Sequence, residues 1–163
     1  MLLWRHAFHN ASLNPYVPYG RQALSIDENR EIFAPEIWDE SEESPEAKGR
    51  GRIKQVWFPG VHSDVGGGYR ETGLSDLALE WMIKEAMAVE HPLIVDMSKL
   101  KLKPSYEDIQ HDERTGWGRA WTEGTRDLIY GEADIYNVTA PERDQVPLSK
   151  PGSEIWRKRP PPE

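Results

Sequence analysis

The clearest hydrophobic pattern in the chain covers residues 74–90, LSDLALEWMIKEAMAVE, where apolar side chains recur every three or four positions. This spacing predicts an amphipathic helix that packs one stripe against a core. Ser75 is placed to cap the helix, with Leu74 packing onto Leu79, and Pro92 is placed to end it. The stripe consists of Leu74, Leu77, Ala78, Trp81, Met82 and Glu85.

Shorter patterns predict the other elements. The apolar run IKQVWF at residues 53–58 has the length and composition of a buried central strand. The run LIVDMSKLKL at residues 93–102 predicts a second, shorter strand. Ser25 and Glu28 have the spacing of a capping box, which predicts a short helix over residues 29–33. The order strand, glycine loop, helix in the middle of the chain predicts the α/β class with a parallel sheet.

The loop between the central strand and the long helix, VHSDVGGGY, is where we expect the chemistry. Glycines between a strand and a helix can bind phosphate, but neither phosphate-binding fingerprint is present, and Asp64 and Asp76 would repel an anion. A metal could bind His62 and Asp64, which point the same way in an extended segment, but the sequence offers no third or fourth ligand.

The third interpretation of this loop is acid–base catalysis by His62. In α/β-hydrolases the catalytic histidine follows a late strand at the carboxyl edge of the sheet. Asp64 would then accept hydrogen bonds from the Gly66 and Gly67 amides, and the glycines, including Gly68, would supply positive φ angles. A histidine satisfied by hydrogen bonds in a tight turn explains the same residues, and the pattern alone does not separate the two.

Composition limits the partners and the location. The chain has 163 residues, a net charge of −8 and no cysteine, so we expect neither nucleic acid nor an anionic membrane as an electrostatic partner, and no disulfide. No signal peptide and no transmembrane segment is evident, so we expect a cytoplasmic protein or export without a signal peptide. We expect no cofactor. The 13 prolines and 13 glycines predict a loop-rich fold, with the acidic stretch 36–46 as a solvated loop.

Two stretches resemble a known family. VWFPGVHSDVGGGY, followed by LSDLALEWM, is similar to the signature near the C-terminal end of the Tle-type α/β-hydrolase domain. ALSIDENREIFAPEIWDE is similar to the family segment HALAIDERR…F.P..W. This family, formerly a domain of unknown function, includes phospholipase effectors of bacterial type VI secretion. The resemblance implies the C-terminal portion of an α/β-hydrolase-like parallel sheet over residues 1–95 and a variable extension over 96–155. The composition of residues 156–163 predicts a proline-rich, disordered tail.

The resemblance also assigns roles. It implies that His62 is the triad base, and that the nucleophile lies in a G-F-S-R-G-A elbow and the acid in a W-D-T-V-G strand end. The 163 residues contain neither motif, and Ser12, Ser25 and Ser63 lack the glycines of an elbow. We therefore expect part of a serine hydrolase that cleaves acyl esters or phospholipids once joined by a missing N-terminal part, and that is inactive alone.

Two other functions stay open at this point. The chain could be a non-catalytic interaction module derived from the hydrolase fold, which the acidic loop and the proline-rich tail would serve. It could also be a complete small hydrolase with an unrecognised nucleophile.

Overall fold

The computed structural model describes residues 11–114, 116–124 and 134–135. Its centre is a parallel sheet in the order β1-β2-β3, made of β1 (Gly20–Ser25), β2 (Ile53–Phe58) and β3 (Asp134–Ile135). The predicted central strand is confirmed, because β2 is buried and has a partner on each side. β1 was not predicted from the sequence.

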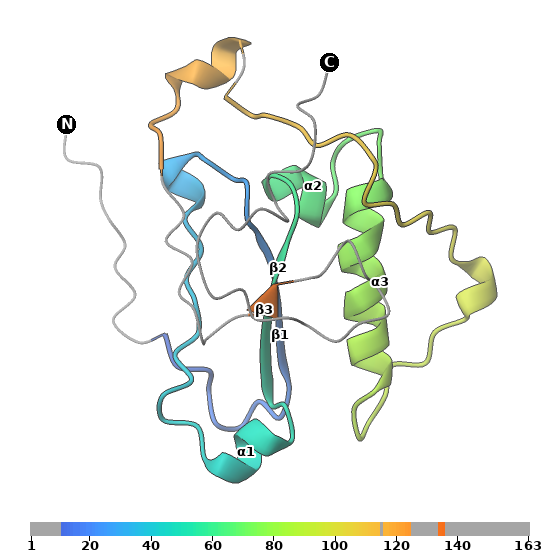
Figure 1. Ribbon diagram of the computed structural model, residues 1–163. Helices are drawn as coiled ribbons and strands as arrows, with labels where there is room; N and C mark the ends of the chain where they lie inside the picture. Colours follow the sequence, from blue (N-terminus) through green and yellow to red (C-terminus); the bar gives the residue numbers. More distant parts are fainter. Residues whose placement is uncertain (1–10, 115, 125–133, 136–163) are drawn as a thin grey trace.

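Helices and long loops surround this sheet, as expected for a loop-rich α/β chain. In Figure 1, α1 and α2 lie at opposite ends of the strands, and α3 runs along one face of the sheet. In the part of the chain that the structure describes, no helix is both long enough and apolar enough to cross a membrane. The helical elements are η1 (Glu31–Phe33), α1 (Pro45–Gly49), α2 (His62–Gly66), α3 (Gly73–Met87), η2 (Met97–Lys99) and η3 (Gly116–Ala120).

β1 and β2 stay paired beyond their strand ends. The amide of Ile26 donates to the Phe58 carbonyl at 3.0 Å, and the amide of Asp27 donates to the Gly60 carbonyl at 3.1 Å. The predicted capping box is therefore wrong: Ser25 is the last residue of β1, and η1 begins only at Glu31. Pairing with the segment that leaves β2 satisfies these backbone amides, so no helix begins next to Ser25. The short helix predicted over residues 29–33 is present only as the 3-10 turn η1.

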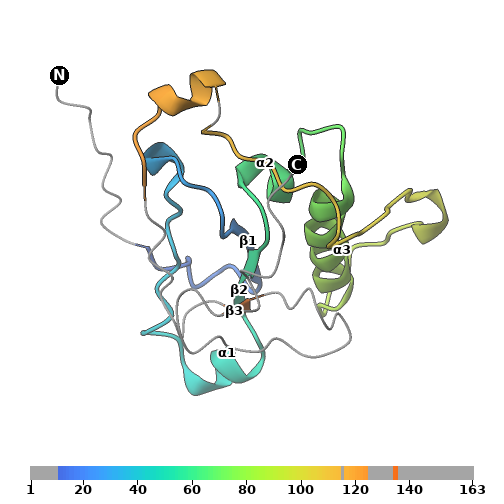
Figure 2. The ribbon, with the colours of Figure 1, turned by 45° about the horizontal axis from the view of Figure 1, so that its top comes forward.

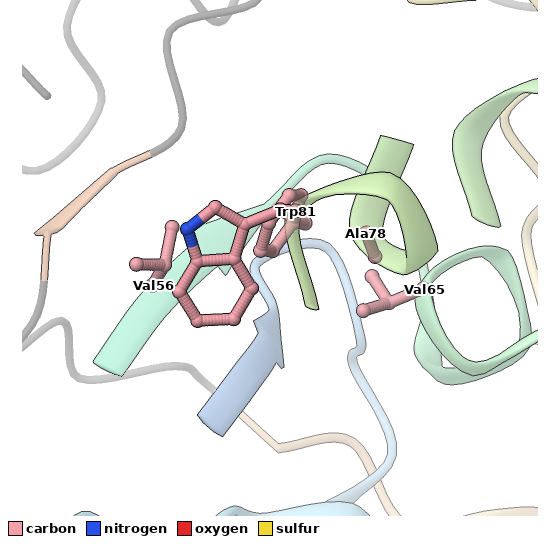
Figure 3. Packing of buried hydrophobic residues seen from close by; sticks show 5 residues of the cluster. Val56, Val65, Ala78 and Trp81 are labelled. Carbon is pink, nitrogen blue, oxygen red and sulfur yellow. The ribbon is translucent and has the colours of Figure 1, made fainter. Parts of the chain in front are cut away.

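The core lies between β2, α2 and α3, and it confirms the predicted stripe of the long helix. Val56 and Phe58 of β2 pack with Val65, Ala78 and Trp81 (Figure 3). The Phe58 and Trp81 rings are 5.5 Å apart between centroids, a favourable tilted contact. Alternation along β2 explains why these two strand residues share one face.

The polar end of the same stripe joins α3 to both strands. The carboxylate of Glu85 binds the Arg21 guanidinium of β1 at 2.7 Å and the Lys54 ammonium of β2 at 2.8 Å. Burial opposes ionisation of Glu85, but its bonds to these two cations outweigh that effect and hold its pKa below the usual value. The stripe of α3 therefore contacts the sheet through apolar packing and through the two ion pairs of Glu85.

The start of α3 differs from the prediction. The helix begins at Gly73 and its N-cap is Thr72, whereas Ser75 donates its hydroxyl to the Thr72 carbonyl at 3.0 Å. Asp108 accepts a hydrogen bond from the Gly73 amide at 2.7 Å, so a distant carboxylate satisfies the first turn. The sequence near Ser75 carries no sign of this partner.

The strand predicted over residues 93–102 is also wrong. This segment contains the short helix η2, and the side chain of Asp96 accepts from the Ser98 amide at 3.1 Å to cap it. That local turn replaces the extended conformation a strand needs. Ile94 of the same segment is 96% exposed.

The acidic segment 36–46 is only partly solvated. Gln55 of β2 accepts from the Trp38 amide at 2.7 Å and donates to the Trp38 carbonyl at 3.0 Å, which fastens the segment to the sheet face opposite α3. Glu43 forms an ion pair with Arg52. Glu42 is exposed, as predicted.

We predict that Phe58→Ala lowers the free energy of unfolding by about 3–5 kcal/mol, because the fully buried ring leaves a cavity between β2 and α3. Urea unfolding followed by circular dichroism measures this change. The control Ile94→Ala, at a 96% exposed site, should change stability by no more than about 0.5 kcal/mol. Equal stability of the two variants would contradict the core described here.

Candidate functional site

The segment that leaves β2 turns sharply before α2. Gly60 has a φ of +99°, and a Cβ atom there would lie 2.4 Å from the Cβ of Asp64, so only glycine fits without strain. The carboxylate of Asp27 accepts from the Gly60 amide at 2.7 Å. Asp27 and Asp64 thus both contact Gly60 and fix the turn that leads into His62.

A buried carboxylate holds the main chain of His62. Glu28, only 1% exposed, accepts from the His62 amide at 3.1 Å. Arg30 donates to the two Glu28 oxygens through Nε at 2.8 Å and Nη2 at 2.7 Å, and its own amide donates at 3.0 Å. Burial opposes the charge on Glu28, but these hydrogen bonds outweigh it and lower the pKa of Glu28 to about 2.

The imidazole of His62 is exposed while its backbone is anchored. Its ring centroid lies 5.0 Å from that of Phe33, the last residue of η1. The Arg30 guanidinium stands 4.0 Å from the centre of the same Phe33 ring. His62 is the first residue of α2, the helix that follows the carboxyl end of β2. The sequence predicted this histidine at the same end of the strand.

A cavity of about 400 Å³ opens beside His62. β1, α2 and α3 supply its walls, and two serines, Ser25 and Ser75, line it as well. Such a cavity can hold an apolar group while an imidazole at its edge transfers a proton. Its apolar lining consists of Ala23, Val65, Ala78, Leu79 and Met82.

Asp64 is buried, but its partners differ from the prediction. Its carboxylate accepts from the Val61 amide at 3.0 Å and from the His111 amide at 3.1 Å, rather than from Gly66 and Gly67. Its other oxygen lies 2.7 Å from Nδ1 of His111. Asp64 thus supports the loop by joining it to a distant segment.

The glycines follow the prediction in part. Gly67 and Gly68 have φ angles of +84° and +142°, as expected, whereas Gly66 is the last residue of α2. The interpretation of this loop as a phosphate site loses support, because the Val61 and His62 amides are already bound to carboxylates.

The metal interpretation of the loop also loses support. Because α2 is helical, the exposed His62 and the buried Asp64 do not share a side as they would in a strand. Within the described ranges, no group of three or more metal-ligating side chains is placed to hold an ion.

Residues 108–114 complete the support of the site. The Tyr69 ring stacks on His111 with centroids 3.5 Å apart, and the Tyr69 hydroxyl donates to Glu113. Burial and the Glu113 charge raise the pKa of Tyr69 above its usual value. Glu113 also lies 3.6 Å from Arg30. A continuous series of contacts therefore runs from Glu28 through residues 108–114 to Asp64. These supporting residues lie after residue 95, where the sequence placed the end of the hydrolase-like part.

Comparison with protein families gives one match. The family model described as the catalytic domain of Tle1-like phospholipase effectors of the type VI secretion system (T6SS) matches residues 2–85. No curated protein and no solved structure matches the chain. The matched region contains β1, β2, α2 and most of α3, together with His62 and Glu28.

We predict that Glu28→Gln lowers the free energy of unfolding by about 3–5 kcal/mol at neutral pH, because it removes the nearer of the two carboxylate charges that face the buried Arg30 guanidinium. The folded-state pKa of Glu28 is lowered from 4.5 to about 2, so the stability due to its charge is present above pH 4.5 and is lost as the pH falls towards 2. Urea unfolding at several pH values should show the two proteins converging over that interval. Glu42→Gln, at an exposed carboxylate, serves as the control. A difference in free energy of unfolding between wild type and Glu28→Gln that does not change with pH would count against the Glu28–Arg30 ion pair.

We predict that His111→Ala loosens the site loop, because the buried Asp64 carboxylate loses a hydrogen-bond partner, at a cost of about 1–3 kcal/mol. Hydrogen exchange measured by mass spectrometry should be faster in the peptide that covers residues 61–66. The exposed His91 provides a matched control in His91→Ala. If both variants exchange at the wild-type rate, His111 does not support this loop.

Proposed function

The chain belongs to the family of Tle1-like phospholipase effector catalytic domains of type VI secretion, and we propose that His62 is the general base of a serine-hydrolase triad that cleaves phospholipid acyl esters. The serine and the acid of this triad come from a segment outside the 163 residues, because the sequence contains no G-x-S-x-G elbow. On this proposal the chain alone does not turn over substrate.

The proposed chemistry uses the exposed imidazole twice. His62 takes the proton from the serine hydroxyl as its oxygen attacks the ester carbonyl, and then gives that proton to the leaving lysophospholipid oxygen as the ester C–O bond breaks. Water then attacks the acyl-enzyme in the same way and releases the fatty acid. The acyl chain occupies the apolar cavity between β1, α2 and α3.

One observation carries this proposal: the exposed ring of His62 stands beside an apolar cavity at the carboxyl end of a parallel strand, while Glu28 anchors its backbone. A histidine that served only to satisfy a tight turn would use its ring nitrogens in that turn. Here the turn is held by the main-chain amides and by Asp27, Glu28 and Asp64 instead.

A second candidate function is a small esterase that is active by itself with Ser25 as nucleophile. Ser25 is not a helix cap, contrary to the sequence prediction, and it lines the same cavity as His62. It lies at the end of β1, next to the end of β2 that leads to His62. The absence of elbow glycines around Ser25 makes this the weaker candidate.

We predict that the purified chain neither hydrolyses a phospholipid ester nor reacts with a fluorophosphonate probe. After mixing with the N-terminal half of a family member that carries G-F-S-R-G-A, both activities should appear. His62→Ala should reduce the turnover of this mixture by at least about 100-fold, because it removes the general base. Release of fatty acid and in-gel labelling are the measurements.

His91→Ala is the matched control, since this histidine is exposed and lies outside the cavity. It should leave the turnover of the mixture unchanged. Wild-type turnover by a folded His62→Ala protein would overturn the proposal. Labelling of the chain alone that disappears in Ser25→Ala would establish the second candidate instead.

A further inference from the structure

A loop that follows α3 projects away from the sheet and exposes apolar side chains. This projecting loop, residues 91–103, carries η2 near its tip and extends outward in both views (Figures 1 and 2). Ile94 is 96% exposed, Leu93 57% and Met97 47%. Three large apolar side chains within five residues form a local patch, unlike the single exposed apolar residues common on protein surfaces.

Basic side chains adjoin this patch. Residues 99–103, KLKLK, alternate between exposed lysines and half-buried leucines, so Lys99, Lys101 and Lys103 are presented on the solvent side. Together with Asp96, the only acid of the projecting loop, they give residues 91–103 a net charge of +2 with His91 neutral. The whole chain carries −8, so this positive charge is a local feature that the total conceals.

The base of the projecting loop is fixed rather than loose. The Lys103 amide donates to the Asp76 carboxylate at 2.7 Å, and the Ser105 amide donates to the Gly73 carbonyl at 3.0 Å. Both partners belong to the first turn of α3, the helix that also lines the cavity beside His62. The apolar tip is therefore held out from the same helix that forms one wall of the proposed site.

We propose that the projecting loop is a membrane-contact surface that docks on a bilayer containing anionic phospholipid. Leu93, Ile94 and Met97 enter the boundary between headgroups and acyl chains, and the three lysines contact lipid phosphates. Exposed apolar side chains flanked by lysines match the two layers of such an interface. A partner protein with an acidic apolar groove, or a second copy of the chain, would not need a tip that extends away from the fold.

Binding of the full chain to lipid vesicles tests this proposal without any catalytic step. Sedimentation with vesicles of phosphatidylcholine and of phosphatidylcholine mixed with phosphatidylglycerol measures the bound fraction. We expect stronger binding to the anionic vesicles, weakened by salt. Ile94→Ser with Met97→Ser should weaken binding to both vesicle types about tenfold or more. Lys99→Gln with Lys101→Gln should remove mainly the gain from phosphatidylglycerol.

Matched controls come from other exposed positions of the chain. Tyr16→Ser, at a side chain that is 92% exposed, and Lys48→Gln with Lys84→Gln should bind vesicles like the wild type. His62→Ala should also bind normally, so failure of the lipid proposal and failure of the catalytic proposal are distinguishable.

Two results would overturn the lipid proposal. One is wild-type binding that Ile94→Ser with Met97→Ser leaves unchanged. The other is no vesicle binding together with a wild-type dimer that the same double variant dissociates, which would assign the patch to a contact between copies.

Discussion

The site depends on the buried carboxylate of Glu28. It accepts hydrogen bonds from Arg30 on one side and from the main-chain amide of His62 on the other. An isolated carboxylate at this depth would favour the protonated form, but the guanidinium and the amides reverse that preference and keep it charged. Arg30 in turn contacts Phe33 and Glu113, so η1 and the segment 108–114 meet at the same charge pair.

This arrangement would meet the two requirements of a general base, the role that we propose for His62. The base must be held in place, and its ring must be free to meet the substrate. Main-chain hydrogen bonds to Asp27, Glu28 and Asp64 hold the loop, whereas the imidazole of His62 stays exposed beside the cavity. The hydrogen bonds that hold the turn therefore do not involve the ring of His62, as the proposed proton transfer requires.

Two elements could be predicted from patterns in the sequence. α3 was predicted from its helical period and β2 from its short apolar run, and the place after β2 made His62 the candidate base. β1 was missed, since GRQALS has little alternation and forms through its pairing with β2. The capping-box pattern at Ser25 was outweighed by that same pairing, which no local pattern encodes.

The support of the site was harder to predict than its histidine. Asp64 finds its partner in His111, 47 residues further along the chain, and no motif marks that histidine. The role of Glu28 likewise depends on where Arg30 and the end of β2 lie in space. Contacts of this kind are set by tertiary packing, so a single sequence contains no direct signal for them.

Amide hydrogen exchange of His62, followed by NMR, would show whether Glu28 holds the main chain of this residue. We expect slow exchange of this amide in the wild-type chain at neutral pH, and much faster exchange in a folded Glu28→Gln variant. Rapid exchange of the His62 amide in the wild-type chain, at the rate of an unprotected amide, would show that Glu28 does not hold this backbone.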